Sequence, residues 1–112
     1  ENNYSRAVEY KINETEKTVK QIWQFGKERG EAFYSPIISD VDYLKSTKNI
    51  LVTSGFISPK ETHNAKIVEV DYATGQVVFE ATLYFKTLNG KKVGGWGQTD
   101  LMYRSERLEL KY

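Results

Sequence analysis

Apolar and polar residues alternate along most of the chain, as they do in β-strands that bury one face. Helical periodicity is weak, and short polar or glycine-containing stretches separate the alternating segments. The segments that we predict as strands are 5–12, 18–25, 35–44, 49–54, 66–72, 76–85 and 100–110. Strands that follow one another through short turns usually pair with their neighbours in the chain. The sequence therefore predicts an all-β, antiparallel fold.

The clearest hairpin signal lies in the second half of the chain. The segment KIVEVDY (66–72) leads through Ala73-Thr74-Gly75 into QVVFEATLYF (76–85). A three-residue connection that ends in glycine suits a hairpin, because glycine accepts the positive φ that such a turn requires.

Two hairpins share a short repeat, which indicates the architecture. Val8-Glu9-Tyr10 and Val68-Glu69-Val70 occupy matching places at an offset of 60 residues, with two further strands between them. A repeating unit of four short antiparallel strands is the blade of a β-propeller. Seven strands in a chain of this length also fit a two-sheet sandwich, and periodicity alone leaves both folds open.

The phase of the repeat predicts about one and a half blades. The chain, residues 1–112, is then a single C-terminal propeller fragment. In this fragment 5–25 is the outer half of one blade, 35–85 is a complete four-stranded blade, and 99–111 is a closing strand. Cut strand edges and uncovered sheet faces favour self-association, so we expect dimers or larger oligomers.

Charge and composition exclude several kinds of site. Sixteen Lys and Arg residues nearly balance fifteen Asp and Glu, and the net charge is +1. Such a chain offers no long-range field for nucleic acid or an anionic membrane, so neither is an expected partner. The chain has no cysteine, which excludes disulfides, thiolate metal sites and cysteine nucleophiles. His63, the single histidine, lies in a polar loop, where we predict it to be solvated and not to bind zinc.

Four stretches of the sequence resemble one known family. They are YSRAVEYKI, QIWQFGKERG, FYSPI and MYRSERL. Together they are similar to the C-terminal region of the bacterial PAPS-independent arylsulfate sulfotransferases, closely over residues 4–40 and more loosely beyond. The resemblance favours the propeller over the sandwich. It implies a six-bladed ring in the periplasm or another extracytoplasmic space, where a sulfuryl group passes from a phenolic sulfate ester to a phenol without a nucleotide cofactor.

The resemblance also implies that the reactive group lies elsewhere. In this family a histidine in the central channel carries the sulfuryl group, and an imidazole nitrogen can both attack sulfur and later release it. Cationic donors stabilise the charge on the sulfuryl oxygens. The resemblance places these residues upstream of Glu1. We therefore assign no catalytic residue to this chain and expect it to be inactive alone.

Four residues are candidates for the wall of the channel. Ser35, Ile38 and Ser39 belong to the strand expected to be innermost, where alternate side chains can meet a ligand. The family offers a threonine at the position of Ile38, so its hydroxyl is lost here or its role passes to Ser35 or Ser39. Arg104 is predicted either to hold a sulfate in the channel or to pair with a surface carboxylate such as Glu106.

A function of another class remains open beside the enzyme. A non-enzymatic β-sandwich or adhesion-type module would bind glycan or protein through its aromatic residues. Trp23 and Trp96 are the candidates for a stacking platform, although Trp23 lies in an apolar strand and is expected in the core. The basic run 86–93 is predicted to be a solvated hairpin tip.

Overall fold

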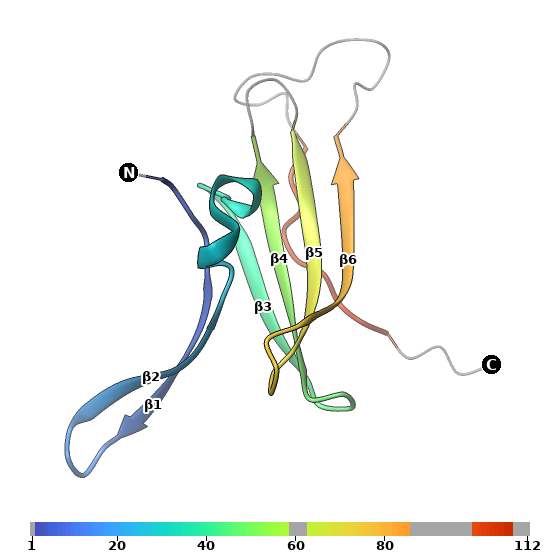
Figure 1. Cartoon of the computed structure of the whole chain (residues 1–112). Helices are drawn as coiled ribbons and strands as arrows, with labels where there is room; N and C mark the ends of the chain where they lie inside the picture. Colours follow the sequence, from blue (N-terminus) through green and yellow to red (C-terminus); the bar gives the residue numbers. More distant parts are fainter. Residues whose placement is uncertain (1, 59–62, 86–99, 109–112) are drawn as a thin grey trace.

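A computed structural model of the chain describes residues 2–58, 63–85 and 100–108. Within these ranges six strands form two antiparallel sheets, and a short 3₁₀ helix joins the sheets (Figure 1). The elements are β1 (Ala7–Asn13), β2 (Thr18–Phe25), η1 (Lys27–Phe33), β3 (Ser39–Leu44), β4 (Asn49–Ile57), β5 (Asn64–Asp71) and β6 (Val77–Tyr84). The predicted all-β, antiparallel fold is confirmed.

The larger sheet keeps the order of the chain, β3-β4-β5-β6, and each neighbouring pair is antiparallel. A meander of four short strands is the architecture of a propeller blade. The sheet lies within 35–85, the range predicted for a complete blade. The fold is thus that of a propeller fragment. The assignment of the separate β1–β2 hairpin to the outer half of another blade stays a prediction.

Only the base of the β1–β2 hairpin packs against the larger sheet (Figure 1). Ala7 and Phe25, at the base, are buried in the core, whereas residues 9–22 are exposed. In a β-sandwich the two sheets would cover one another along their strands. The hairpin therefore does not make the facing sheets that the sandwich alternative requires.

One hydrophobic cluster joins the hairpin, η1 and one face of the larger sheet. Its buried members are Ala7, Phe25, Phe33, Ile50, Val52, Val68 and Val70. Aromatic rings extend the cluster outward: Trp23 stacks on Phe25 at 6.5 Å and on Tyr72 at 5.7 Å between ring centroids. Offset stacked rings contribute beyond the area they bury. Trp23 is packed against the core, as its apolar strand predicted.

β4 is the best-buried strand because both of its faces are covered. Every residue from Ile50 to Gly55 is buried, which matches the nearly continuous apolar sequence ILVTSGFI. The predicted strand ended at Ser54, but β4 continues through an irregularity in register to Ile57. The β5–β6 turn follows the prediction: Gly75 has φ +71°, and its N–H donates to the carbonyl of Asp71 at 2.8 Å.

Three expectations need correction. The segment GKERG, predicted as a loop, lies largely in η1. The strand predicted from Ser35 begins only at Ser39, because the backbone groups of 35–38 bond to Ser5 and Gly55 and not to a strand ladder. The closing strand predicted at 99–111 is wrong for residues 100–108, which have no regular secondary structure. Residues 99 and 109–111, Trp96 and the run 86–93 lie outside the described residues.

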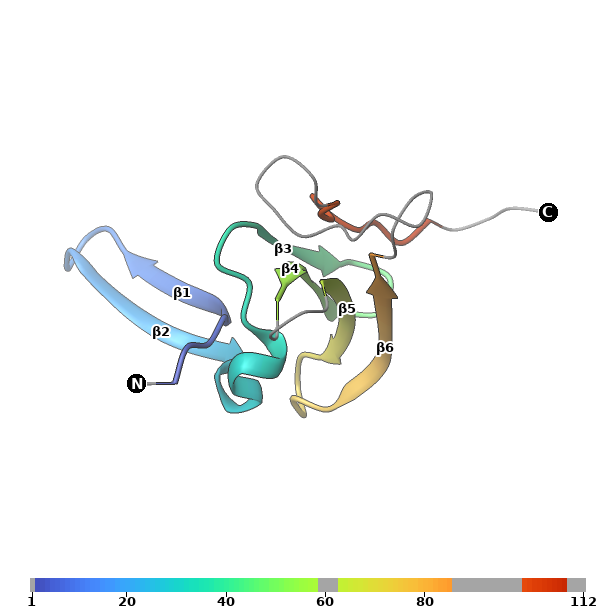
Figure 2. The ribbon, with the colours of Figure 1, turned by 90° about the horizontal axis from the view of Figure 1, so that it is seen from above.

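Residues 100–108, called the strap below, cross a face of the larger sheet and not its edge. The hairpin and the strap lie on opposite sides of this sheet (Figure 2). A segment that lies across a face cannot exchange ladder hydrogen bonds with the strands beneath it. The strap makes one backbone hydrogen bond to β4, from Met102 N–H to the Gly55 carbonyl at 3.0 Å. This geometry explains why its alternating sequence does not form a strand here.

Candidate functional site

Ser35 holds the chain at the start of β3. Its buried hydroxyl donates to the carbonyl of Ile38 at 2.6 Å and accepts from the N–H of Phe56 at 3.0 Å. Its own N–H donates to Oγ of Ser5 at 2.9 Å. Buried polar groups need such partners, because an unpaired one costs free energy. Ser35 therefore joins three segments of the chain, and its hydroxyl is engaged within the fold.

The connection before η1 depends on a glycine. Gly26 has φ +109°, a conformation that residues with a Cβ rarely adopt. A Cβ at this position would lie 2.9 Å from the carbonyl oxygen of Ser5 and 3.2 Å from the ring of Phe33. The N–H of Gly26 donates to the carboxylate of Glu28 at 3.1 Å. The close approach explains why the motif places glycine here.

Ile38 and Ser39 lie beside Ser35 at the free edge of the larger sheet. The carbonyl of Ile38 accepts from the N–H of Gly55 at 3.0 Å, and the side chain is half-buried. Ser39 is exposed and is the first residue of the edge strand β3. The structure thus brings these three candidates together at one end of β3. Their contact with a ligand stays a prediction.

Arg104 is placed apart from the other three candidates. It lies on the strap, with its side chain 60% exposed and paired with the carboxylate of Glu106. This is the surface pairing that the sequence offered as one of two alternatives. Among the described residues, no hydrogen bond joins Arg104 to Ser35, Ile38 or Ser39.

Glu69 is a buried charge that the sequence analysis did not single out. Its side chain is only 8% exposed, and both carboxylate oxygens accept from Nη1 of Arg107, at 2.7 and 2.8 Å. Asn49 donates to the same carboxylate at 2.6 Å. Such partners compensate the cost of removing a carboxylate from water. Glu69 belongs to the repeat Val68-Glu69-Val70. A charged residue between two apolar residues of a strand was the sequence signal that could have indicated a buried ion pair.

An open hollow of about 560 Å³ adjoins this ion pair. It lies on the face of the larger sheet that the strap crosses. Its walls combine apolar side chains with the ion pair, Glu106 and a few neutral polar groups. The lining residues are Thr47, Asn49, Leu51, Ile67, Glu69, Val78, Phe79, Ser105, Glu106 and Arg107.

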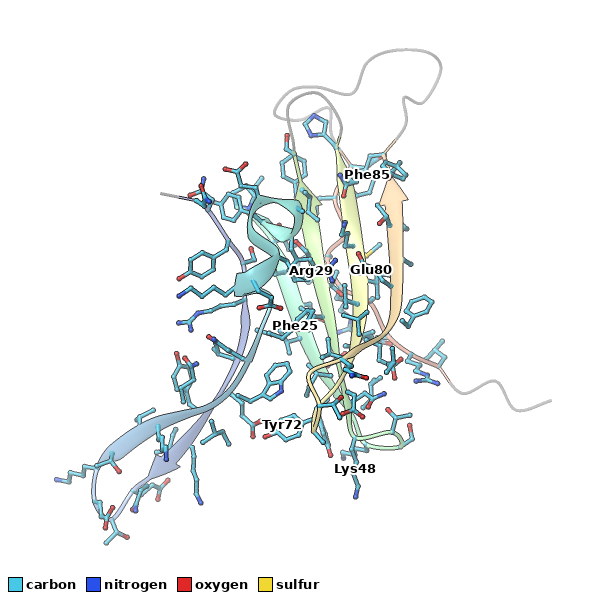
Figure 3. All side chains as sticks on the ribbon, in the orientation of Figure 1. Phe25, Arg29, Lys48, Tyr72, Glu80 and Phe85 are labelled. Carbon is cyan, nitrogen blue, oxygen red and sulfur yellow. The ribbon has the colours of Figure 1, made fainter. Side chains whose placement is uncertain are left out.

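A second ion pair joins η1 to β6 on the opposite face. Nη2 of Arg29 donates to both carboxylate oxygens of Glu80 (Figure 3), and Lys66 approaches the same carboxylate at 3.3 Å. The guanidinium also lies over the rings of Phe33, at 5.0 Å, and Phe25, at 5.9 Å from the centroids. These contacts fix η1 against the sheet.

In the part of the chain that the structure describes, three groups have shifted pKa values for which the contacts account. Burial raises the pKa of Glu80, but the hydrogen bonds and charges of Arg29 and Lys66 outweigh burial and lower the pKa from its ordinary value. The side chain and N–H of Thr74 bond the carboxylate of Asp71 and lower its pKa. A hydrogen bond to Glu9, followed by burial and the charge of Glu9, raises the pKa of Tyr72.

His63 is packed and not free in solvent as predicted. It is half-buried, and its ring stacks on Phe56 with centroids 5.2 Å apart and planes at 17°. Its Nδ1 is buried without a hydrogen-bond partner among the described residues. Within 2–58, 63–85 and 100–108, no three His, Asp or Glu side chains converge as metal ligands would. No helix in the same ranges has the length and hydropathy needed to cross a bilayer.

The arylsulfotransferase (ASST) family model matches residues 1–95, most of the chain. The chain belongs to this family. Over 80 residues it is 49% identical to a protein of Lelliottia amnigena named arylsulfate sulfotransferase AssT. It is 42% identical over 80 residues to a protein of the same name from Escherichia coli O6:H1. Each match covers 69% of this chain and 13% of the relative, so the arylsulfotransferase relatives are far longer than the matched segment.

The motifs that indicated the arylsulfotransferase family join the two sheets. QIWQFGKERG supplies Phe25 to the core and Arg29 to the ion pair with Glu80. FYSPI supplies Phe33 to the core and Ser35 to the start of β3. The residues of these two motifs therefore hold the fold of this chain together.

Proposed function

We propose that this chain is a sector of an arylsulfate sulfotransferase propeller and contributes to the wall of its channel. The observation that carries the proposal is the family match over residues 1–95, combined with a four-stranded blade-like sheet inside that range. The names of the two relatives support the same activity for the complete protein. The complete protein would then be an enzyme, with this chain as a structural part of it.

The proposed reaction passes a sulfuryl group in two steps without a nucleotide cofactor. A histidine nitrogen attacks the sulfur of a phenolic sulfate ester; the S–O bond to the donor breaks, and the phenolate leaves and takes up a proton. The oxygen of an acceptor phenol then attacks the sulfur, loses its proton and releases the histidine. We place this histidine upstream of Glu1.

The charged side chains of this chain support a scaffold role. Arg29 pairs with Glu80, and Arg107 pairs with Glu69, so two prominent guanidinium groups are engaged in joining elements. Ser35 is likewise engaged with backbone groups. We therefore infer that the isolated chain has no turnover.

The proposed wall consists of the free edge of β3 and the residues before it. Ser39 is exposed at this edge, next to Ile38, which replaces the threonine that the resemblance implies. With the hydroxyl of Ser35 engaged, Ser39 is the better candidate to supply a hydroxyl to the channel. Arg104 contributes only if its pair with Glu106 opens.

The proposed setting is the periplasm or another extracytoplasmic space, with a phenolic sulfate donor and a phenol acceptor as the small-molecule partners. Exposed apolar side chains support self-association of the isolated chain. Those on the β1–β2 hairpin are Tyr10, Ile12, Val19 and Ile22. Light scattering at tens of micromolar tests this point, and a strict monomer would contradict it.

The activity is tested by comparing the complete protein with this chain alone. Each is incubated with 4-nitrophenyl sulfate and a phenol acceptor, and release of 4-nitrophenol is followed by absorbance. Turnover by the complete protein and none by the chain is the expected result. A complete, folded protein without acceptor-dependent turnover would contradict the assignment.

A further inference from the structure

Gly55 joins the strap to the start of β3 through its backbone. Its N–H donates to the carbonyl of Ile38 at 3.0 Å, and its own carbonyl accepts from the N–H of Met102 at 3.0 Å. A Cβ at position 55 would meet both neighbours, because it would overlap the carbonyl oxygen of Met102 and lie 2.7 Å from Cγ2 of Ile38. The strap and the side chain of Ile38 therefore share the space that a side chain at Gly55 would fill.

The carbonyl of Ile38 is fully engaged within the fold. It accepts from Oγ of Ser35 at 2.6 Å as well as from the N–H of Gly55. A carbonyl oxygen has two lone pairs, and these two donors use both. The side chain of Ile38 is half-buried and has no group that could bind a phenolic oxygen. Ile38 therefore presents to a phenol an apolar surface, whose position decides which ring substituents fit beside it.

Two further contacts fix the strap to β4 and β5. The hydroxyls of Ser105 and Thr53 are 2.5 Å apart, and Nη1 of Arg107 donates to the buried carboxylate of Glu69 at 2.7 Å. Thr53 is itself only 1% exposed. A buried hydroxyl or carboxylate that loses its partner costs free energy, so these contacts favour a single placement of the strap. The first residues of the strap are thereby held in one position against the sheet.

We infer that Met102 is a positioning residue for Ile38, and that the strap thereby sets which phenols the channel accepts. The inference rests on the proposed function, in which Ile38 belongs to the channel wall. With the strap in place, the backbone of Met102 occupies the space beside Gly55 into which the side chain of Ile38 would otherwise withdraw. A closely packed apolar wall discriminates between acceptors by the size of their ring substituents. Release of the strap should therefore favour larger phenols.

The test compares two acceptors in the complete protein. The donor is 4-nitrophenyl sulfate, and kcat/KM is measured for phenol and for 2-naphthol, which carries a second fused ring. Because both acceptors react with the same sulfated enzyme, the ratio of the two kcat/KM values is independent of the donor step. Met102→Pro removes the N–H that donates to Gly55. We expect this variant to shift the ratio toward 2-naphthol by roughly tenfold.

Further variants separate positioning from other effects. Ser105→Ala loosens the strap without a change to its backbone, and it should shift the ratio in the same direction. Leu108→Ala is the matched control, since Leu108 lies on the same strap and is 73% exposed. In an Ile38→Ala background Met102→Pro should leave the ratio unchanged, because the side chain that the strap positions is then absent.

The outcomes distinguish this inference from the proposed function. A complete wild-type protein without acceptor-dependent turnover would overturn both. Turnover with the wild-type acceptor ratio in Met102→Pro and Ser105→Ala would overturn this inference alone, even if both rates fell, because the strap would then be merely structural. A shift that persists in the Ile38→Ala background would also overturn it, since the strap would then act on the acceptor without Ile38. An equal shift in Leu108→Ala would show that the contacts of the strap with the sheet are not its source.

Discussion

Arg29 and Glu80 are 51 residues apart in the chain, yet one guanidinium nitrogen donates to both oxygens of the carboxylate, at 2.7 and 2.8 Å. The contact joins the connection after the hairpin to the last strand of the larger sheet. The same guanidinium covers Phe33 and Phe25. A single substitution of Arg29 therefore removes both the ion pair and the contacts with the two rings.

Replacing Arg29 by Ala should lower the free energy of unfolding of the chain by about 1–2 kcal/mol, since a charge-assisted hydrogen bond and a cation–π contact are lost together. Urea unfolding followed by fluorescence measures the change. Arg6→Ala is the control, because among the described residues the side chain of Arg6 donates to Gln21 and Gln24 of the neighbouring strand β2 and to no residue of the larger sheet. Equal losses in the two variants would contradict a special role for Arg29.

The lowered pKa of Glu80 predicts a loss of stability in acid. Because the pKa of Glu80 lies below its ordinary value in the folded state, the folded protein keeps this carboxylate ionised to a lower pH than the unfolded chain does. The stabilisation is therefore complete above the unfolded pKa and is lost as the pH falls through the folded pKa. Asp71, whose pKa is lowered by its hydrogen bonds from Thr74, should likewise lose its contribution to stability as the pH falls.

Glu80→Gln should reduce the loss of stability at low pH. Asp71→Asn should reduce this loss independently of Glu80. Urea midpoints measured from about pH 6 down to about pH 3, a range that spans the unfolded pKa of a carboxylate, check both variants against the wild type. A Glu80→Gln variant with an unchanged slope over this range would contradict the ion pair as its source.

Gly55→Ala should detach the strap. An added Cβ would overlap the carbonyl oxygen of Met102 and lie 2.7 Å from Cγ2 of Ile38. Overpacking of this kind costs roughly 1–3 kcal/mol. Hydrogen exchange of the Met102 amide, which bonds the Gly55 carbonyl, should accelerate. Gly30→Ala is the control, because nothing lies near its Cβ position; its positive φ should cost stability without releasing the strap.

Alanine variants of Ser35 and Ser39 should differ in their effects, because Ser35 supports the fold and Ser39 is proposed to contact the ligand. Ser35→Ala leaves the N–H of Phe56 without its acceptor and should cost about 1–3 kcal/mol of stability. Ser39→Ala should leave the urea midpoint unchanged, because Ser39 is exposed. In the complete protein Ser39→Ala should raise KM for the phenol acceptor. A Ser39→Ala protein with wild-type kinetics would remove Ser39 from the wall.

Much of the strand order was predictable from alternation alone. β1, β2, β5 and β6 fall within two residues of their predicted bounds, since apolar and polar residues alternate in these segments and turn residues separate them. β4 was predicted three residues short, because a strand covered on both sides has no alternation to mark its end.

The strap and the start of β3 were not predictable in the same way. The strap alternates as a strand does, but its partner is the face of a sheet, and local sequence does not encode which surface will cover a segment. Ser35 was predicted as a candidate for ligand contact because of its type and place, yet its position relative to Ser5 and Phe56 follows from tertiary structure. The buried pair of Glu69 and Arg107 likewise joins residues 38 apart.

The sulfuryl group itself gives the most direct test of the proposed function. The complete protein is incubated with 4-nitrophenyl sulfate and no acceptor, digested under mild conditions, and searched by mass spectrometry for a peptide that has gained one sulfuryl group. We predict that gain on a histidine upstream of Glu1 and on no peptide from residues 1–112. A sulfated peptide from within these residues, or none in an enzyme that turns over, would contradict the proposal.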